Sequence, residues 1–126
     1  MSLSLLMTIN AIVAAVFGIA FVVAPGQAAS LYGVTADPQF RYLAQLFGSA
    51  LVGFAVLTWV ARNATASDAR KAIVLALFVS NALGFVLALI GQLGGVMNTM
   101  GWSTVVIYLL LALGFGYFQF MKPSTP

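Results

Sequence analysis

The feature that most constrains this chain is a stretch of 50 residues, from Ala72 to Met121, that contains no charged side chain. A helix that crosses the roughly 30 Å hydrocarbon core of a bilayer needs about 20 mostly apolar residues, because each residue adds about 1.5 Å. The stretch is therefore too long for one crossing and has to fold back on itself. The glycine-rich and amide-rich segment 91–101 marks the break, and we expect a new helix to open at Trp102.

The composition of the whole chain also indicates that lipid, and not water, surrounds it. Hydrophobic residues make up 63% of the 126 residues and charged residues 6%, whereas a soluble domain is about half apolar and about a quarter charged. A small soluble domain buries only about two thirds of the surface of its unfolded chain, so most of these side chains would face water. We therefore expect the lipid bilayer to surround most of the chain.

Four spans are expected on this basis: the predicted fold class is an all-α integral membrane four-helix bundle that forms a single transmembrane domain. The first span ends before Pro25, because the residue that precedes a proline is pushed out of the helical region. Asp37 and Pro38 form an N-cap and a first helical position for the second span, and Ser67 caps the third. The predicted spans are 3–24, 40–61, 70–92 and 102–121.

A short helix is expected between the first two spans. Residues 26–33 contain alanines and a serine, and Gly33 follows them as a C-cap residue. Leu31 and Tyr32 would dip into the lipid headgroups, since aromatic side chains favour the boundary between membrane and water. We therefore predict that this helix lies at the membrane interface.

The five basic residues predict the orientation of the chain. Four of them, Arg62, Arg70, Lys71 and Lys122, fall on the side that holds both termini when the chain crosses four times, and Arg41 alone falls opposite. Basic residues concentrate on the cytoplasmic side of membrane proteins, which places both termini in the cytoplasm. Because these residues are scattered between apolar runs, they form no basic patch, and we expect no binding of nucleic acid.

A few polar residues inside the spans are candidates for ligand binding. Arg41, Gln45 and Ser49 recur every four residues and therefore share one helix face. Arg41 would hold an anionic or carbonyl-bearing ligand, while Gln45, Asn10 and Asn81 bond to it deeper in the bundle. The structural interpretation, which we favour, is that the amides join helices and that the arginine reaches the interface.

Small residues at a spacing of four predict close contacts between helices in the second half of the chain. Such residues let helix backbones approach where lipid removes the hydrophobic driving force. They face either a neighbouring helix of this chain or a partner protein. The predicted packing residues are Ser80, Gly84, Ala88, Ala112 and Gly116.

The inventory of reactive side chains argues against catalysis. The chain has no cysteine and no histidine, which removes thiolate chemistry and the usual zinc and haem ligands. Its only carboxylates, Asp37 and Asp68, fall where helices are expected to begin, so neither is positioned for acid–base work. We expect no enzymatic activity, no metal and no cofactor.

Three landmarks stand out in the first half of the chain: the break at Pro25, the sequence Leu31-Tyr32-Gly33 that ends the short helix, and Arg41 at the opening of the second span. In these features the first half resembles small uncharacterised bacterial four-helix inner-membrane proteins, which include the DoxX-like group. The resemblance implies a compact bundle in a cell inner membrane and, in some members, association with a larger redox complex.

Two functions of different class follow. The first is a non-catalytic accessory or structural subunit, which packs within a larger membrane complex through a protein partner or through self-association. The alternative is a binder or carrier of a lipophilic small molecule, such as a quinone, a carotenoid or a lipid. Its site would be an interhelical cleft beside Arg41, Gln45 and Asn81.

Overall fold

The computed structural model describes residues 2–121, and its regular secondary structure over that range is entirely helical. The expectation of four long helices with a short helix between the first two is confirmed, and four helical stretches are long and apolar enough to cross a membrane. The elements are α1 (Leu3–Val23), α2 (Pro25–Leu31), α3 (Pro38–Ala61), α4 (Asp68–Leu93), α5 (Gly101–Gly116) and the π-helical turn η1 (Tyr117–Met121).

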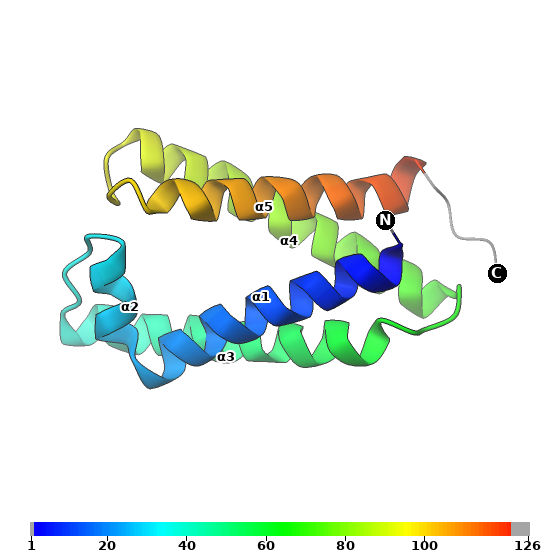
Figure 1. Ribbon diagram of the computed structural model, residues 1–126, viewed down its shortest axis with the longest axis horizontal. Coiled ribbons are helices and arrows are strands. Elements are labelled where there is room, and N and C mark those ends of the chain that lie inside the picture. The colour runs from blue at the N-terminus through cyan, green and yellow to red at the C-terminus, as the bar shows by residue number, and fades with distance from the viewer. Residues whose placement is uncertain (1, 122–126) are drawn as a thin grey trace.

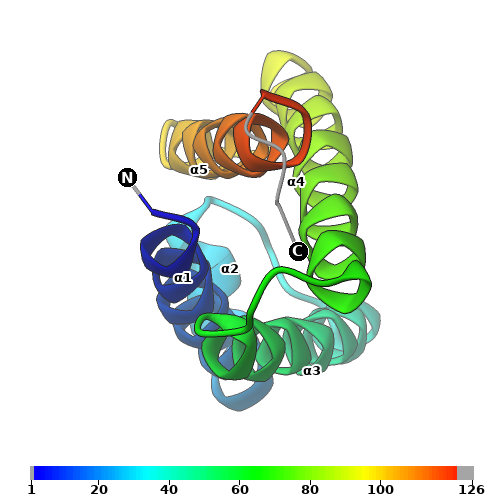
Figure 2. The same ribbon diagram turned by 90° about the vertical axis from the view of Figure 1, so that its right-hand side faces the viewer.

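The long helices pack as two pairs. Helix α1 lies along α3, and α4 lies along α5 (Figure 1). Seen along the bundle, one pair occupies each side, and α2 lies behind them (Figure 2). The start of α1, the α3–α4 loop and the end of α5 lie at one end of the bundle, whereas α2 and the α4–α5 loop lie at the other (Figure 1).

Local signals set the helix ends, as the sequence predicts. The Asp37 carboxylate accepts a hydrogen bond from the Phe40 backbone N–H at 2.8 Å, and Pro38 occupies the first helical position, where no N–H is needed. The Ser67 hydroxyl oxygen accepts from the Arg70 backbone N–H at 3.2 Å and caps α4. The ends of these helices thus follow from their own residues.

A glycine with a left-handed backbone follows the end of α2 by two residues. Gly33 has a φ of 73°, a conformation that a residue with a Cβ atom adopts at a cost. The turn lets the Gly33 N–H donate to Ser30 O at 3.1 Å and the Val34 N–H donate to Ala29 O at 3.0 Å. These bonds satisfy carbonyls that a helix end leaves open. The expected short helix and its closing glycine are both confirmed.

Two glycines let α1 and α3 approach each other closely. Gly18 and Gly48 face each other, and a Cβ atom added to Gly48 would lie 2.8 Å from the Gly18 carbonyl oxygen and 2.9 Å from Phe21 Cβ. Contact at this range leaves no room for a side chain. Small residues at a helix crossing bring the backbones together, which is the main source of attraction between helices in lipid.

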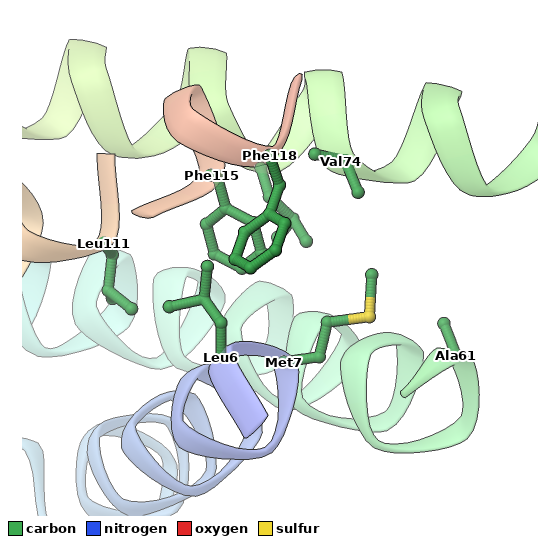
Figure 3. Packing of buried hydrophobic residues seen from close by; sticks show 8 residues of the cluster. Leu6, Met7, Ala61, Val74, Leu111, Phe115 and Phe118 are labelled. Carbon is green, nitrogen blue, oxygen red and sulfur yellow. The ribbon is translucent and has the colours of Figure 1, made fainter. Parts of the chain in front are cut away.

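One hydrophobic cluster joins the two helix pairs at the end of the bundle where α1 begins. Leu6 of α1 points toward Phe115 of α5, whereas Met7 points toward the side of the cluster that holds Ala61 and Val74 (Figure 3). A Cβ atom at Gly114 would lie 2.9 Å from Leu6 Cδ2, so α1 and α5 come close here. The buried members are Leu6, Met7, Ala61, Val74, Leu77, Leu111, Phe115 and Phe118.

The α4–α5 loop joins the pairs at the opposite end. Asn98 donates from its backbone N–H to Tyr32 O at 2.9 Å and from its side-chain amide to Leu31 O at 3.1 Å. Gln92 in turn donates to Asn98 O at 3.0 Å. These bonds use carbonyls at the C-terminal end of α2 and tie the loop to it. The two helix pairs are therefore held together at both ends of the bundle.

The Gly18–Gly48 crossing predicts that two glycine substitutions in α3 change the stability of the fold differently. Gly48→Ala forces a clash with the backbone of α1 and should destabilise the fold by about 1–3 kcal/mol. Gly53→Ala is the matched control, because nothing lies within 4 Å of a Cβ atom there, and it should leave stability unchanged or slightly higher. Unfolding of the purified protein in mixed micelles measures both. Equal stability of the two variants would contradict the crossing.

Candidate functional site

A cavity lies between the two helix pairs, in the space between their joined ends. Its volume is about 360 Å³, and side chains from all four long helices and from α2 line it. Pockets that hold small molecules in proteins commonly measure about 300–1,000 Å³. The cavity is therefore large enough for a small ligand or part of a lipid chain.

The lining of the cavity is apolar and rich in aromatic rings. None of the lining residues that the structure describes carries a charge. Rings of this kind suit flat or extended apolar molecules, since they offer a large contact area with few torsions to restrict. The aromatic lining residues are Phe17, Phe21, Tyr32, Phe40, Phe47 and Tyr108.

Asn10 of α1 is one of the few polar groups in this lining. The side chain is 5% exposed, and its amide nitrogen donates to the Thr58 hydroxyl oxygen at 3.5 Å. Thr58 gives its own hydrogen to Phe54 O at 2.8 Å, so toward Asn10 it serves as an acceptor. This pairing turns the NH₂ group toward Thr58. The amide oxygen of Asn10 accepts no hydrogen bond from any residue between 2 and 121.

Asn81 of α4 shows the same arrangement in the other helix pair. It is 6% exposed, and its amide nitrogen donates to Leu77 O, one turn earlier, at 2.8 Å. A carbonyl can only accept, so the NH₂ group has to face Leu77. Within the described part of the chain, the Asn81 amide oxygen likewise receives no donor.

Both asparagines lie toward the end of the cavity that the hydrophobic cluster closes. Leu6 and Leu77 belong to this cluster and precede Asn10 and Asn81 by one helical turn, and Leu111 belongs to the cluster and also lines the cavity. Thr104 and Tyr108 line the cavity further along α5, toward the α4–α5 loop. We call the region of Asn10, Asn81 and Leu111 the floor of the cavity.

The cavity reaches the surface of the bundle along α3. Leu43 and Phe47 line it although they are 63% and 47% exposed. A residue that both lines a cavity and faces outward marks its opening. The opening lies on the side of a helix that is long and apolar enough to cross a membrane.

The residues predicted for ligand binding divide into two groups. Asn10 and Asn81 line the same cavity. Arg41, Gln45 and Ser49 do share a face of α3, but the cavity lining includes none of them. Their role in binding stays a prediction.

The residues of the Arg41 face contact α1 and α2 instead. The exposed Arg41 guanidinium group lies against α2, where a Cβ atom added to Gly26 would be 3.6 Å from Arg41 Nε. Gln45 donates from its side-chain amide to Val22 O at 3.1 Å, near the end of α1. The Ser49 hydroxyl donates to Leu46 O, in its own helix, at 2.8 Å. The Gln45 contact joins α3 to a carbonyl in the last turn of α1, where helices leave such groups without internal partners.

The predicted packing residues lie mostly where α4 meets α5. A Cβ atom at Gly84 would lie 2.5 Å from the Tyr108 ring, and one at Gly116 would lie 2.9 Å from the Phe78 ring. Ala112 is buried and Ala88 is partly buried, whereas Ser80 is exposed. Gly84 has a direct consequence for the site, because the space that it leaves lets the Tyr108 ring lie in the cavity wall.

Several functional residues were not expected from the sequence. Thr58 orients Asn10, Tyr108 lines the cavity, and Asn98 joins the loop to α2. Asn98 carried the only visible signal, because an amide in a glycine-rich loop often bonds to nearby backbone groups. Thr58 sits in an apolar helix, where nothing in the local sequence shows which face turns inward. Tyr108 shares a helix face with Ala112 and Gly116, a spacing of four that predicts helix packing and not a cavity wall.

No protein-family model matches this chain, and no curated protein or solved structure does so either. The DoxX-like resemblance of the first half therefore stays a prediction. The helix arrangement and the cavity carry the functional inference by themselves.

Proposed function

We propose that this chain is a non-catalytic membrane protein that binds a lipophilic small molecule in the cavity between its two helix pairs. The observation that carries the proposal is the cavity itself, an aromatic chamber lined by two buried asparagine residues whose amide oxygens receive no hydrogen bond from the described residues. Neither oxygen is fully enclosed by protein atoms, so each is accessible to a molecule in the cavity. A bound molecule that donates to one of them gains a hydrogen bond in an apolar environment.

The outer surface of the bundle supports insertion into a bilayer. Large apolar side chains on all four long helices face outward, among them Val16, Val60, Leu87 and Leu110. In water these surfaces would drive aggregation, since soluble monomers rarely expose apolar patches of more than a few hundred Å². In lipid the same surfaces are solvated, and helices satisfy their backbone polar groups internally.

The proposed location is a cell inner membrane, with both termini in the cytoplasm. The basic residues Arg62, Arg70 and Lys71 lie in or beside the α3–α4 loop, at the end of the bundle where α1 begins. Arg41 lies at the other end, beside α2. Lys122, which contributes to the same prediction, falls outside the described residues. This distribution supports a cytoplasmic α3–α4 loop and an α2 at the opposite interface.

Cysteine labelling tests the proposed orientation. The natural chain has no cysteine, so Thr65→Cys in the α3–α4 loop and Thr35→Cys after α2 each introduce a single reactive thiol. In intact cells a membrane-impermeant maleimide should label the thiol at position 35 and leave that at position 65 unmodified. Permeabilised cells, in which both should react, are the control. Labelling at position 65 in intact cells would contradict the orientation.

Blocking the cavity tests the proposed function. Ala44 is buried in the cavity lining, so Ala44→Trp should fill the chamber and abolish retention of its ligand. Ala50 is exposed on the same helix and outside the lining, which makes Ala50→Trp the matched control. After purification in mild detergent and solvent extraction, mass spectrometry should find an apolar compound with the natural protein and with Ala50→Trp.

The comparison requires that Ala44→Trp still folds, which helical content and elution volume establish. The same compounds in equal amounts from all three proteins would refute binding in the cavity.

The accessory-subunit hypothesis stays a prediction. The small residues that motivated it include Gly84 and Gly116, and both of these contact aromatic rings of the same chain. Packing between α4 and α5 of the same chain therefore accounts for these small residues. The cavity is the feature that favours the binding function over the accessory-subunit function.

A further inference from the structure

We propose that the cavity selects neutral apolar molecules that carry a hydroxyl group, and that the amide oxygen of Asn10 or of Asn81 accepts the hydrogen bond that this group donates. This inference rests on the proposed function and specifies the ligand that the cavity would take. The inference starts from two asparagines, one in each helix pair, that line the same uncharged cavity. The amide oxygen of each receives no hydrogen bond from the described residues.

The first step is that both amides have a defined orientation. A primary amide can be turned over, which exchanges its oxygen and its nitrogen. In Asn81 the flipped form would place two acceptor oxygens against each other at the Leu77 carbonyl. In Asn10 the flipped form would face Thr58, whose only hydrogen already goes to the Phe54 carbonyl. Each amide therefore keeps its NH₂ group toward the protein and leaves its oxygen as an acceptor.

The second step is that the other polar groups of the lining do not discriminate between ligands that donate and ligands that accept hydrogen bonds. The hydroxyls of Thr104, Tyr108 and Tyr32 can rotate and can either donate or accept. They would adapt to a carbonyl, an ether or a hydroxyl group on the ligand. Each asparagine keeps a second N–H that can donate to a ligand, but its oxygen can only accept, so a ligand without a donor leaves both oxygens of the floor unpaired.

The third step excludes other ligand classes. A carboxylate or phosphate would meet these carbonyl oxygens with none of the described lining residues positively charged to compensate. An ether, a ketone or a fully oxidised quinone has only acceptors and would leave both amide oxygens unpaired. A hydroxyl group donates to an amide oxygen and can accept from the remaining N–H of the same amide. Long-chain alcohols, isoprenoid alcohols and quinols share this group.

The shape of the cavity agrees with a hydroxyl group that enters first. The asparagines lie on the floor, at the end closed by the hydrophobic cluster, while the opening lies along α3 at Leu43 and Phe47. A molecule bound with its hydroxyl group at the floor would place its apolar chain against the aromatic walls. The chain would then extend toward the opening and the surrounding lipid.

Binding of three matched probes tests the inference. The whole protein is placed in phosphatidylcholine nanodiscs, whose lipid has no hydroxyl group, and is given a radiolabelled long-chain primary alcohol, its methyl ether or the alkane of equal chain length. Empty nanodiscs provide the background. The alcohol should bind about tenfold more tightly than the ether, because the ether leaves a buried acceptor unpaired.

Two substitutions and one control connect this preference to the asparagines. Asn10→Leu and Asn81→Leu combined in one protein should reduce the ratio of alcohol affinity to ether affinity severalfold, since the double variant removes both acceptors from the floor. Ser80→Ala should preserve the ratio, because Ser80 is the exposed neighbour of Asn81 and its hydroxyl donates to Leu77 O of its own helix. The ranking of probes on the natural protein stands even where a variant fails to fold.

The outcomes separate the inference from the function on which it rests. Equal binding of all three probes, the result expected if water alone pairs with the two oxygens, would overturn the hydroxyl preference and leave a lipophilic binder. An undiminished preference in the folded double variant would overturn the assignment to Asn10 and Asn81. Binding of no probe above the background of empty nanodiscs would overturn both the inference and the proposed function.

Discussion

The packing of Leu6 against Phe115, within the cluster that also contains Met7, is the contact on which the rest of the structure depends. It joins the α1–α3 pair to the α4–α5 pair at one end, and Asn98 joins them at the other end through the carbonyls of Leu31 and Tyr32. Between these two connections the pairs separate, and the cavity fills the space. Because this packing closes the floor, a single cluster determines both how the pairs meet and how deep a ligand can reach.

Within this frame the two asparagines have a double role. Each uses its amide nitrogen in the way that membrane helices commonly use polar side chains, to bond to a neighbouring hydroxyl or backbone carbonyl. Each residue also lines the cavity and leaves its amide oxygen with no donor among the described residues. The structural and the functional interpretations of these residues are therefore compatible. The nitrogen contributes to packing, and the oxygen gives the chamber its proposed chemical preference.

The parts of the fold that were predictable from the sequence are those set by local chemistry. Pro25 ends α1, Asp37 and Ser67 cap α3 and α4, and Gly33 closes α2, because each acts on backbone groups within a few residues. The break between α4 and α5 was visible for the same reason. An apolar run that is too long for one crossing has to turn, and the glycines show where.

The pairing of the helices and the site could not be predicted in this way. In lipid the outer faces of helices are as apolar as the inner ones, so hydrophobic periodicity no longer marks the buried face. A spacing of four placed Arg41, Gln45 and Ser49 on one face correctly, yet nothing local showed that this face meets α1 and α2 and lies outside the cavity lining. Asn10 and Asn81 come together only through contacts between distant helices.

The central claim is that the space between the helix pairs holds a lipophilic molecule, and nuclear magnetic resonance in deuterated lipid tests it most directly. The methyl groups of Val13 and Leu111 line the cavity and report on what fills it. The account predicts cross-relaxation between these methyl groups and non-exchangeable protons of a bound molecule, with little transfer from water. Strong transfer from water to both residues, without any aliphatic partner from outside the chain, would contradict it.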